Sequence, residues 1–155
     1  MKTRMKWSPT LASRWALLPM RVVVALGFLV HGAAKWNRGP AKFAALLGHI
    51  GIPAPLAAAW STTAVELVCG TALLLGLWVT VACIPLAATM LVAMFTIHVH
   101  YGFSAVNTVG LTAAGPQFGP PGYEINLLYI AILAALALSG PTALSIDAVR
   151  HAERS

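Results

Sequence analysis

Charged residues are scarce in this chain of 155 residues. Asp, Glu, Lys and Arg make up 9% of it, and only 4 residues are acidic. A soluble domain carries about 25% charged residues, so the composition excludes an ordinary soluble globular domain. Hydrophobic residues make up 59% of the chain, and the mean hydropathy is +0.80. We therefore predict an integral membrane protein whose length suits one compact bundle of helices.

Cysteine is also scarce, and its placement excludes several kinds of redox site. The 2 cysteines, Cys69 and Cys83, both lie inside apolar stretches, where a cysteine ordinarily acts as a small buried hydrophobe. The chain has no Cys-x-x-Cys pair, no haem-attachment motif and no nucleotide-binding fingerprint. The residues alone therefore show no redox chemistry, and we expect no metal site from the cysteines.

The formal net charge of +6 does not indicate a nucleic-acid partner. The basic residues lie at the ends of apolar stretches, where membrane topology places them. The partner that this pattern predicts is the lipid bilayer.

Four apolar stretches are candidates for crossing a bilayer, which takes about 20 residues for a hydrocarbon core of roughly 30 Å. The first is longer than the apolar region of a signal peptide, about 7–15 residues, and no clear cleavage site follows it, so we expect a retained helix. We predict an all-α, four-transmembrane-helix bundle. Its parts are a cytoplasmic tail at residues 1–16, a membrane domain at 17–139 with spans at about 17–36, 55–77, 79–100 and 123–138, and a second cytoplasmic tail at 140–155.

Lysine and arginine near the ends of the spans predict the orientation. The basic residues of the two predicted tails are Lys2, Arg4, Lys6, Arg14, Arg21, Arg150 and Arg154. The first external loop has fewer, namely Lys35, Arg38 and Lys42, and the second external loop has none. We therefore expect a multi-pass inner-membrane protein with both termini in the cytoplasm. In this orientation Arg21 extends its side chain to the inner interface.

The two external connections differ in composition. Residues 41–50 of the first are expected to form a short interfacial helix. The second, 101–122, is rich in glycine and proline, and a loop of this length without structure of its own tends to be functional or disordered.

Glu66 is the most informative single residue, because it lies close to the middle of the second span. A carboxyl group at that depth costs several kcal/mol unless it is paired or faces a polar cavity. His31 and Lys35 are four residues apart at the outer end of the first span and so share a helix face. We predict Lys35 or His31 as the partner of Glu66, and Lys35 could also reach Glu124. Two structural alternatives are that Glu66 only locks helix packing through a hydrogen bond, and that Lys35 extends outward with no partner.

Three further polar residues lie at the same outer level: His98, His100 and Glu124. Together with His31 and Lys35 they outline a funnel with Glu66 at its floor. We assign Glu66, His31 and Lys35 as candidate catalytic residues, and His98, His100 and Glu124 as candidate cofactor-binding residues. A metal site at His98 and His100 would require unwinding of the helix, since residues two apart point to nearly opposite sides, or a contribution from His31.

Short motifs along nearly the whole chain resemble those of the DoxX family of small four-helix membrane proteins. Arg21, Tyr123-Glu124 and Gly140-Pro141 with Ser145-Ile146-Asp147 belong to them. The longer ones are Gly27-Phe28-Leu29-Val30-His31-Gly32-Ala33-Ala34-Lys35, Phe43 to Pro53, Glu66-Leu67-Val68-Cys69-Gly70 with Leu75-Gly76-Leu77, and Ala93 to His98 with Gly102-Phe103. In the turn that follows Gly140-Pro141, Thr142, Ala143 and Leu144 stand where the family commonly has glycine, a basic residue and an aromatic one. We therefore expect this turn to have little role in the protein.

The resemblance implies a link to redox chemistry. Some relatives are quinone-reducing subunits, and others accompany oxidoreductases or oxidative-stress systems. Our first functional hypothesis is therefore a redox-associated, quinone-linked membrane subunit, in which Glu66 or an imidazole takes a proton from a quinol. The alternatives are a non-catalytic scaffold or assembly partner of a membrane or periplasmic oxidoreductase, and a small-molecule or proton conduit. Whether the chain is itself catalytic, and whether it forms a homo-oligomer, stays open.

Overall fold

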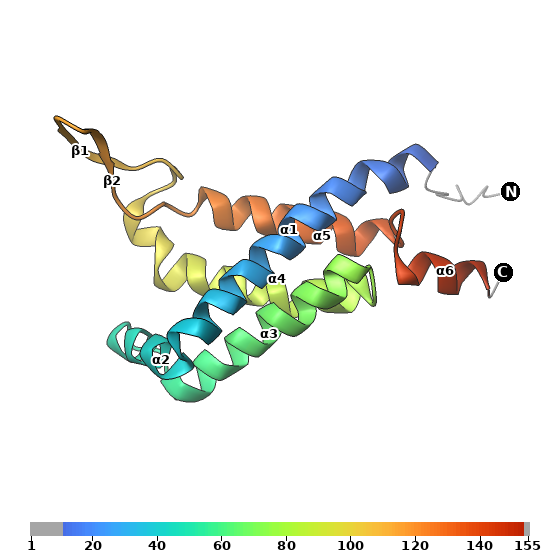
Figure 1. Cartoon of the computed structure of the whole chain (residues 1–155), viewed down its shortest axis with the longest axis horizontal. Helices are drawn as coiled ribbons and strands as arrows, with labels where there is room; N and C mark the ends of the chain where they lie inside the picture. The colour runs from blue at the N-terminus through green and yellow to red at the C-terminus, as the bar shows by residue number, and fades with distance from the viewer. Residues whose placement is uncertain (1–10, 154–155) are drawn as a thin grey trace, which may run out of the picture.

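The structure is a computed structural model that describes residues 11–153. Over these residues the chain forms a helical bundle with one small β-hairpin at one end (Figure 1). The helices are α1 (Leu11–Arg38), α2 (Pro40–His49), α3 (Pro55–Leu75), α4 (Val79–Thr96), α5 (Glu124–Ser139) and α6 (Ile146–Ala152), with a 3-10 turn η1 (His98–Tyr101) and the strands β1 (Thr108–Thr112) and β2 (Gly115–Phe118).

Three helices are long and apolar enough to cross a membrane: the Arg14–Arg38 part of α1, α3 and α4. The fourth, α5, has 16 residues and would reach about 24 Å at 1.5 Å per residue, which is short of a full hydrocarbon core. The existence of the four predicted apolar helices is confirmed. Their number as complete spans and the side on which the termini lie stay predictions.

The boundaries of two helices differ from those predicted. α1 begins at Leu11, so residues 11–16, predicted to be a tail, are helical; residues 1–10 and 154–155 of the predicted tails lie outside the described residues. α4 ends at Thr96, and the chain tightens into η1 instead of continuing to residue 100. The predicted short helix at 41–50 is present as α2.

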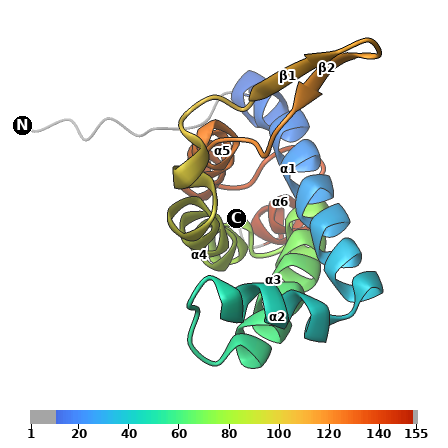
Figure 2. The same cartoon turned by 90° about the vertical axis from the view of Figure 1, so that its left-hand side faces the viewer.

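The four long helices pack in the order α1, α3, α4, α5 around the bundle, as the end-on view in Figure 2 shows. The core near the α6 end is closed by large apolar side chains, among them Leu73, Leu86 and Leu133. α5 meets α1 where the rings of Phe28 and Tyr129 make an edge-to-face contact at 5.4 Å between centroids. A side chain at Gly27 would collide with the Tyr129 hydroxyl, so this close approach depends on glycine.

The predicted loop 101–122 is not structureless. β1 and β2 pair as an antiparallel hairpin, with Leu111 opposite Pro116 and Thr112 opposite Gly115. In both views the hairpin projects sideways from the bundle, at the same end as α2 (Figures 1 and 2). The glycine and proline content indicated a loop, and the short run of β-branched residues around Val109 was too brief to indicate a strand against that background.

The expectation that Arg21 extends to the interface is wrong. Arg21 is 2% exposed, and its guanidinium donates hydrogen bonds to Thr142 Oγ1 and to the carbonyl oxygens of Ala143 at 3.1 Å and Leu144 at 2.8 Å. The segment Gly140–Ser145, which we call the closing turn, is therefore packed into the end of the bundle rather than lying loose on its surface.

Asp147 fixes the same end of the bundle from the start of α6. Its two carboxylate oxygens accept hydrogen bonds from the backbone N–H groups of Trp78 and Val79, each at 3.0 Å. These N–H groups lie at the beginning of α4 and have no partner within the helix itself. The helix dipole favours a negative charge at this end. Gly76, in the left-handed conformation at the end of α3, has no room for a side chain against Ser145.

Candidate ligand cavity with a buried ion pair

A cavity of about 740 Å³ lies in the half of the bundle nearer to α2 and the hairpin. Ligand sites in proteins are commonly about 300–1,000 Å³ in volume and mostly apolar, with a few polar groups that orient the ligand. The wall of this cavity follows the same pattern. Its polar or ionisable members are His31, Lys35, Ser61, Thr62, Glu66, Thr89, Thr96, His98, Asn126 and Tyr129.

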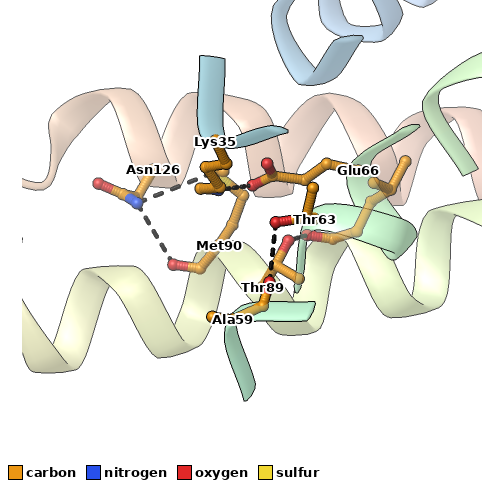
Figure 3. A network of polar contacts seen from close by, with 8 residues as sticks. Lys35, Ala59, Thr63, Glu66, Thr89, Met90 and Asn126 are labelled. Atoms are coloured by element: carbon orange, nitrogen blue, oxygen red, sulfur yellow. Dashed lines mark hydrogen bonds and ion pairs between the residues drawn. The ribbon is translucent and has the colours of Figure 1, made fainter. Parts of the chain in front are cut away.

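Glu66 and Lys35 form an ion pair on this wall. Lys35 Nζ, from α1, donates to Glu66 Oε1, from α3, and the two side chains point toward each other in Figure 3. Glu66 is 2% exposed, so the pair lies inside the bundle. Lys35 Nζ also lies 5.1 Å from the centroid of the Phe43 ring on α2, within the range of a cation–π interaction. The alternative in which Lys35 extends outward unpaired is wrong.

The second oxygen of Glu66, Oε2, is buried and has no hydrogen-bond partner among the described residues. A carboxylate has about four lone-pair positions, and leaving a charged acceptor unpaired away from water is costly. The carboxylate of Glu66, a residue of the cavity wall, therefore retains an unused acceptor position.

Small residues bring α1 and α3 close enough for this pair to form. A side chain at Gly32 would lie 2.9 Å from Leu67 Cγ and 3.2 Å from Glu66 Cβ. Gly70 makes the corresponding approach one turn further along α3, against Leu29 and Phe28. Because Lys35 follows Gly32 by three residues on the same face of α1, the close contact of the two helices sets its ammonium beside the carboxylate.

Asn126, on α5, is a polar cavity residue that the sequence analysis missed. It is 4% exposed, and its side-chain nitrogen donates to the carbonyl oxygen of Met90 on α4 at 3.3 Å (Figure 3). Its position as an amide within a long apolar run was the signal that could have identified it. Thr63 and Thr89 also lie near the pair, but each hydroxyl donates to a carbonyl of its own helix, at 2.8 Å.

Two of the three predicted histidines, His31 and His98, are in the cavity wall. His31 is exposed and lines the cavity from α1. His98 lines it from η1, and its Nδ1 lies 2.9 Å from the carbonyl oxygen of Pro121. Because a carbonyl only accepts hydrogen bonds, Nδ1 carries the hydrogen, and a neutral ring then has its acceptor at Nε2.

His100 and Glu124, the other two candidate cofactor-binding residues, do not line the cavity. His100 is exposed on η1. Glu124 Oε2 accepts a hydrogen bond from the backbone N–H of Ala105 at 2.8 Å, which ties the base of the hairpin to the start of α5. Across the described residues, no three side chains of His, Cys, Asp or Glu come together in an arrangement that could hold a metal ion.

The apolar spans, the bundle and the paired intramembrane charges together define a small helical membrane protein. A comparison with family models supports this class and narrows it, since the model described as DoxX matches residues 16–99. The chain belongs to the DoxX family, and the predicted resemblance is confirmed.

A relative from Haemophilus influenzae is 31% identical over 130 residues, which cover 83% of this chain and 85% of the relative. It is described as an uncharacterized protein. No solved structure matches the chain.

Proposed function

We propose that this DoxX-family membrane protein is a redox-associated subunit that binds a quinol or quinone headgroup in its cavity and handles the protons of that ligand at Glu66. In the proposed orientation both termini lie in the cytoplasm, and the cavity is in the outer half of the inner membrane. The electrons pass to or from an associated oxidoreductase subunit.

One observation carries this proposal: Glu66 lines a largely apolar cavity, and its carboxylate has one oxygen paired with Lys35 and one oxygen without a partner among the described residues. The ion pair at the first oxygen offsets the free-energy cost of a charge at that depth. The free oxygen is an acceptor for a ligand hydroxyl. The apolar remainder of the wall suits the ring and tail of a lipid-soluble molecule.

The chemistry assigned to each residue follows from its donors and acceptors. Oxidation of a quinol to a quinone releases two electrons and two protons. Glu66 Oε2 accepts the hydrogen bond, and then the proton, from one hydroxyl. Nε2 of His98 is the second acceptor on the wall. Lys35 holds Glu66 in place and offers its remaining N–H groups to a quinone carbonyl, whereas His31 lies on the exposed side of the cavity.

The test compares a short-tailed benzoquinol with its dimethyl ether, which has the same ring but no hydroxyl donors. The wild-type protein in lipid vesicles should bind the quinol at least about tenfold more tightly, because a hydrogen bond to a charged group contributes about 1.5–3 kcal/mol. In Glu66→Gln most of this preference should be lost.

Glu124→Gln is the matched control, since Glu124 is a carboxylate near the same end that binds the hairpin base and not the cavity. It should retain the wild-type preference. Equal binding of quinol and ether by the wild type, or the same loss in both variants, would contradict the proposal.

A further inference from the structure

The segment between η1 and α5 carries no charge. From Gly102 to Tyr123 there is no Asp, Glu, Lys or Arg, although the segment lies outside the helices that cross the membrane. Several of its large apolar side chains are strongly exposed, with Leu111 at 82%, Phe118 at 64% and Val109 at 63%. Extramembrane loops that face only water are ordinarily polar and rich in turn residues, so this surface is unusual.

Leu111, Pro116 and Phe118 lie on one face of the hairpin, which also carries Thr108 opposite Phe118, and Val109 falls at a register shift in β1. Leu111 and Pro116 are opposite each other in the register, and side chains opposite each other in an antiparallel pair lie on the same face. Phe118 is two residues from Pro116 in β2 and so shares that face. The other face carries Thr112, Gln117 and Gly110, which alternate with them. The hairpin is therefore amphipathic across its thickness.

The position of the hairpin relative to the bundle is fixed by its base. Backbone hydrogen bonds join Gly122 N–H to Ser104 O at 2.9 Å, Tyr123 N–H to Gly102 O at 3.0 Å and Glu124 N–H to Phe103 O at 2.9 Å. A side chain at Gly122 would collide with the Gly102 carbonyl. The sideways projection of the hairpin in Figures 1 and 2 is therefore a built feature of the fold.

The lengths of the adjoining helices place this base near the membrane surface. α4 has 18 residues and α5 has 16, which correspond to about 27 and 24 Å, whereas the hydrocarbon core is roughly 30 Å thick. Neither helix can carry the hairpin far above the core. The rings of Phe103 and Tyr123 pack edge-to-face beside the base, with centroids 5.5 Å apart, and aromatic residues are enriched at this level of a bilayer.

We propose that β1 and β2 form an interfacial anchor that lies flat in the lipid headgroup layer beside the bundle. Its Leu111, Pro116 and Phe118 face turns toward the acyl chains, and its Thr112 and Gln117 face turns toward water. The depth is limited to the interface, because a two-stranded sheet has unpaired backbone groups at both edges, and these cannot enter the hydrocarbon core.

The test places a nitroxide spin label on each face in turn, in the full chain in lipid vesicles. Leu111→Cys and Thr112→Cys are matched neighbours that point to opposite faces, and both are made with Cys69→Ala and Cys83→Ala. Spin relaxation is measured with oxygen, which concentrates in lipid, and with a water-soluble nickel chelate equilibrated across the vesicles. We expect the label at 111 to respond at least about threefold more to oxygen than to the chelate, and the label at 112 to show the reverse.

Any other outcome contradicts the proposal that the hairpin is an interfacial anchor. If the chelate reaches both positions equally, the hairpin stands in water. If position 111 is shielded from both reagents, a protein surface covers it, which would indicate a second copy of the chain or another subunit. Circular dichroism of each labelled variant serves as the control that the helical bundle is intact.

Discussion

Arg21 and Glu66 are both charged, both 2% exposed and both inside helices long and apolar enough to cross a membrane, yet their surroundings differ. Arg21 donates to three oxygens of the closing turn, all within its own end of the bundle. Glu66 lies in the wall of a cavity, where, among the described residues, Lys35 pairs with one of its oxygens and nothing pairs with the other. The hydrogen bonds of Arg21 hold the closing turn against the bundle, whereas Glu66 keeps an acceptor position for a ligand.

The packing around the two residues follows the same division. Near Arg21 the chain segments press together, since a side chain at Gly76 would come within 2.7 Å of the Arg21 guanidinium and of the Ser145 backbone. Near Glu66 the helices α3 and α4 both contribute to the cavity wall instead of packing solidly. Both residues keep one buried polar atom without a partner among the described residues, Arg21 Nε and Glu66 Oε2, but only Glu66 lines a cavity. A buried charge with an open hydrogen-bonding position therefore indicates a functional site only when it lies at a cavity.

Among the variants that test this contrast, Arg21→Met is expected to have the largest effect on stability. The change should lower the free energy of unfolding by about 3 kcal/mol, because it removes the charged donor of several buried hydrogen bonds and leaves their acceptors unpaired. Thermal unfolding in detergent measures the loss. Trypsin cleavage after Arg150 in α6 should also become faster, as the closing turn loosens.

Arg38→Met is the control for this experiment, since Arg38 is exposed at the other end of the same helix. It should leave both readouts unchanged. A wild-type cleavage rate in Arg21→Met would show that the closing turn is held by other contacts.

A smaller loss of stability is expected from Lys35→Met, which leaves Glu66 without its cation. Breaking a fully buried pair costs about 3–5 kcal/mol. We expect a smaller loss of about 2 kcal/mol here, because the Lys35 side chain is 21% exposed and both residues line a cavity. Thermal unfolding measures this as well. A ligand that binds Glu66 should raise the stability of the wild type, and that of Lys35→Met by less. An undiminished stability in Lys35→Met would mean that the pair contributes nothing.

The contrast also explains which parts of the molecule could be predicted from the sequence. The pair of Lys35 and Glu66, 31 residues apart, was predictable because a carboxylate inside an apolar span requires a partner, and few candidates exist. The membrane helices were predictable from the length of the apolar stretches. Both inferences depend on side-chain chemistry that the sequence displays directly.

The closing turn was not predictable in the same way. Arg21 binds two backbone carbonyls there, at Ala143 and Leu144, and every residue type offers a carbonyl. The departure of residues 142–144 from the family pattern therefore did not remove the interaction, and the expectation of little from this turn was wrong. The sequence likewise did not show that His100 and Glu124 lie away from the cavity, because the end of α4 at Thr96 changes where the residues after it point.

The most direct test of the account is an infrared difference spectrum between the free protein and the protein saturated with the benzoquinol, recorded in lipid. If the free oxygen of Glu66 receives the ligand, a carboxyl band should change on binding in the wild type and in Glu124→Gln, and this change should be absent in saturated Glu66→Gln. The account is contradicted if the ligand binds and no carboxyl band responds, or if the same change persists in Glu66→Gln.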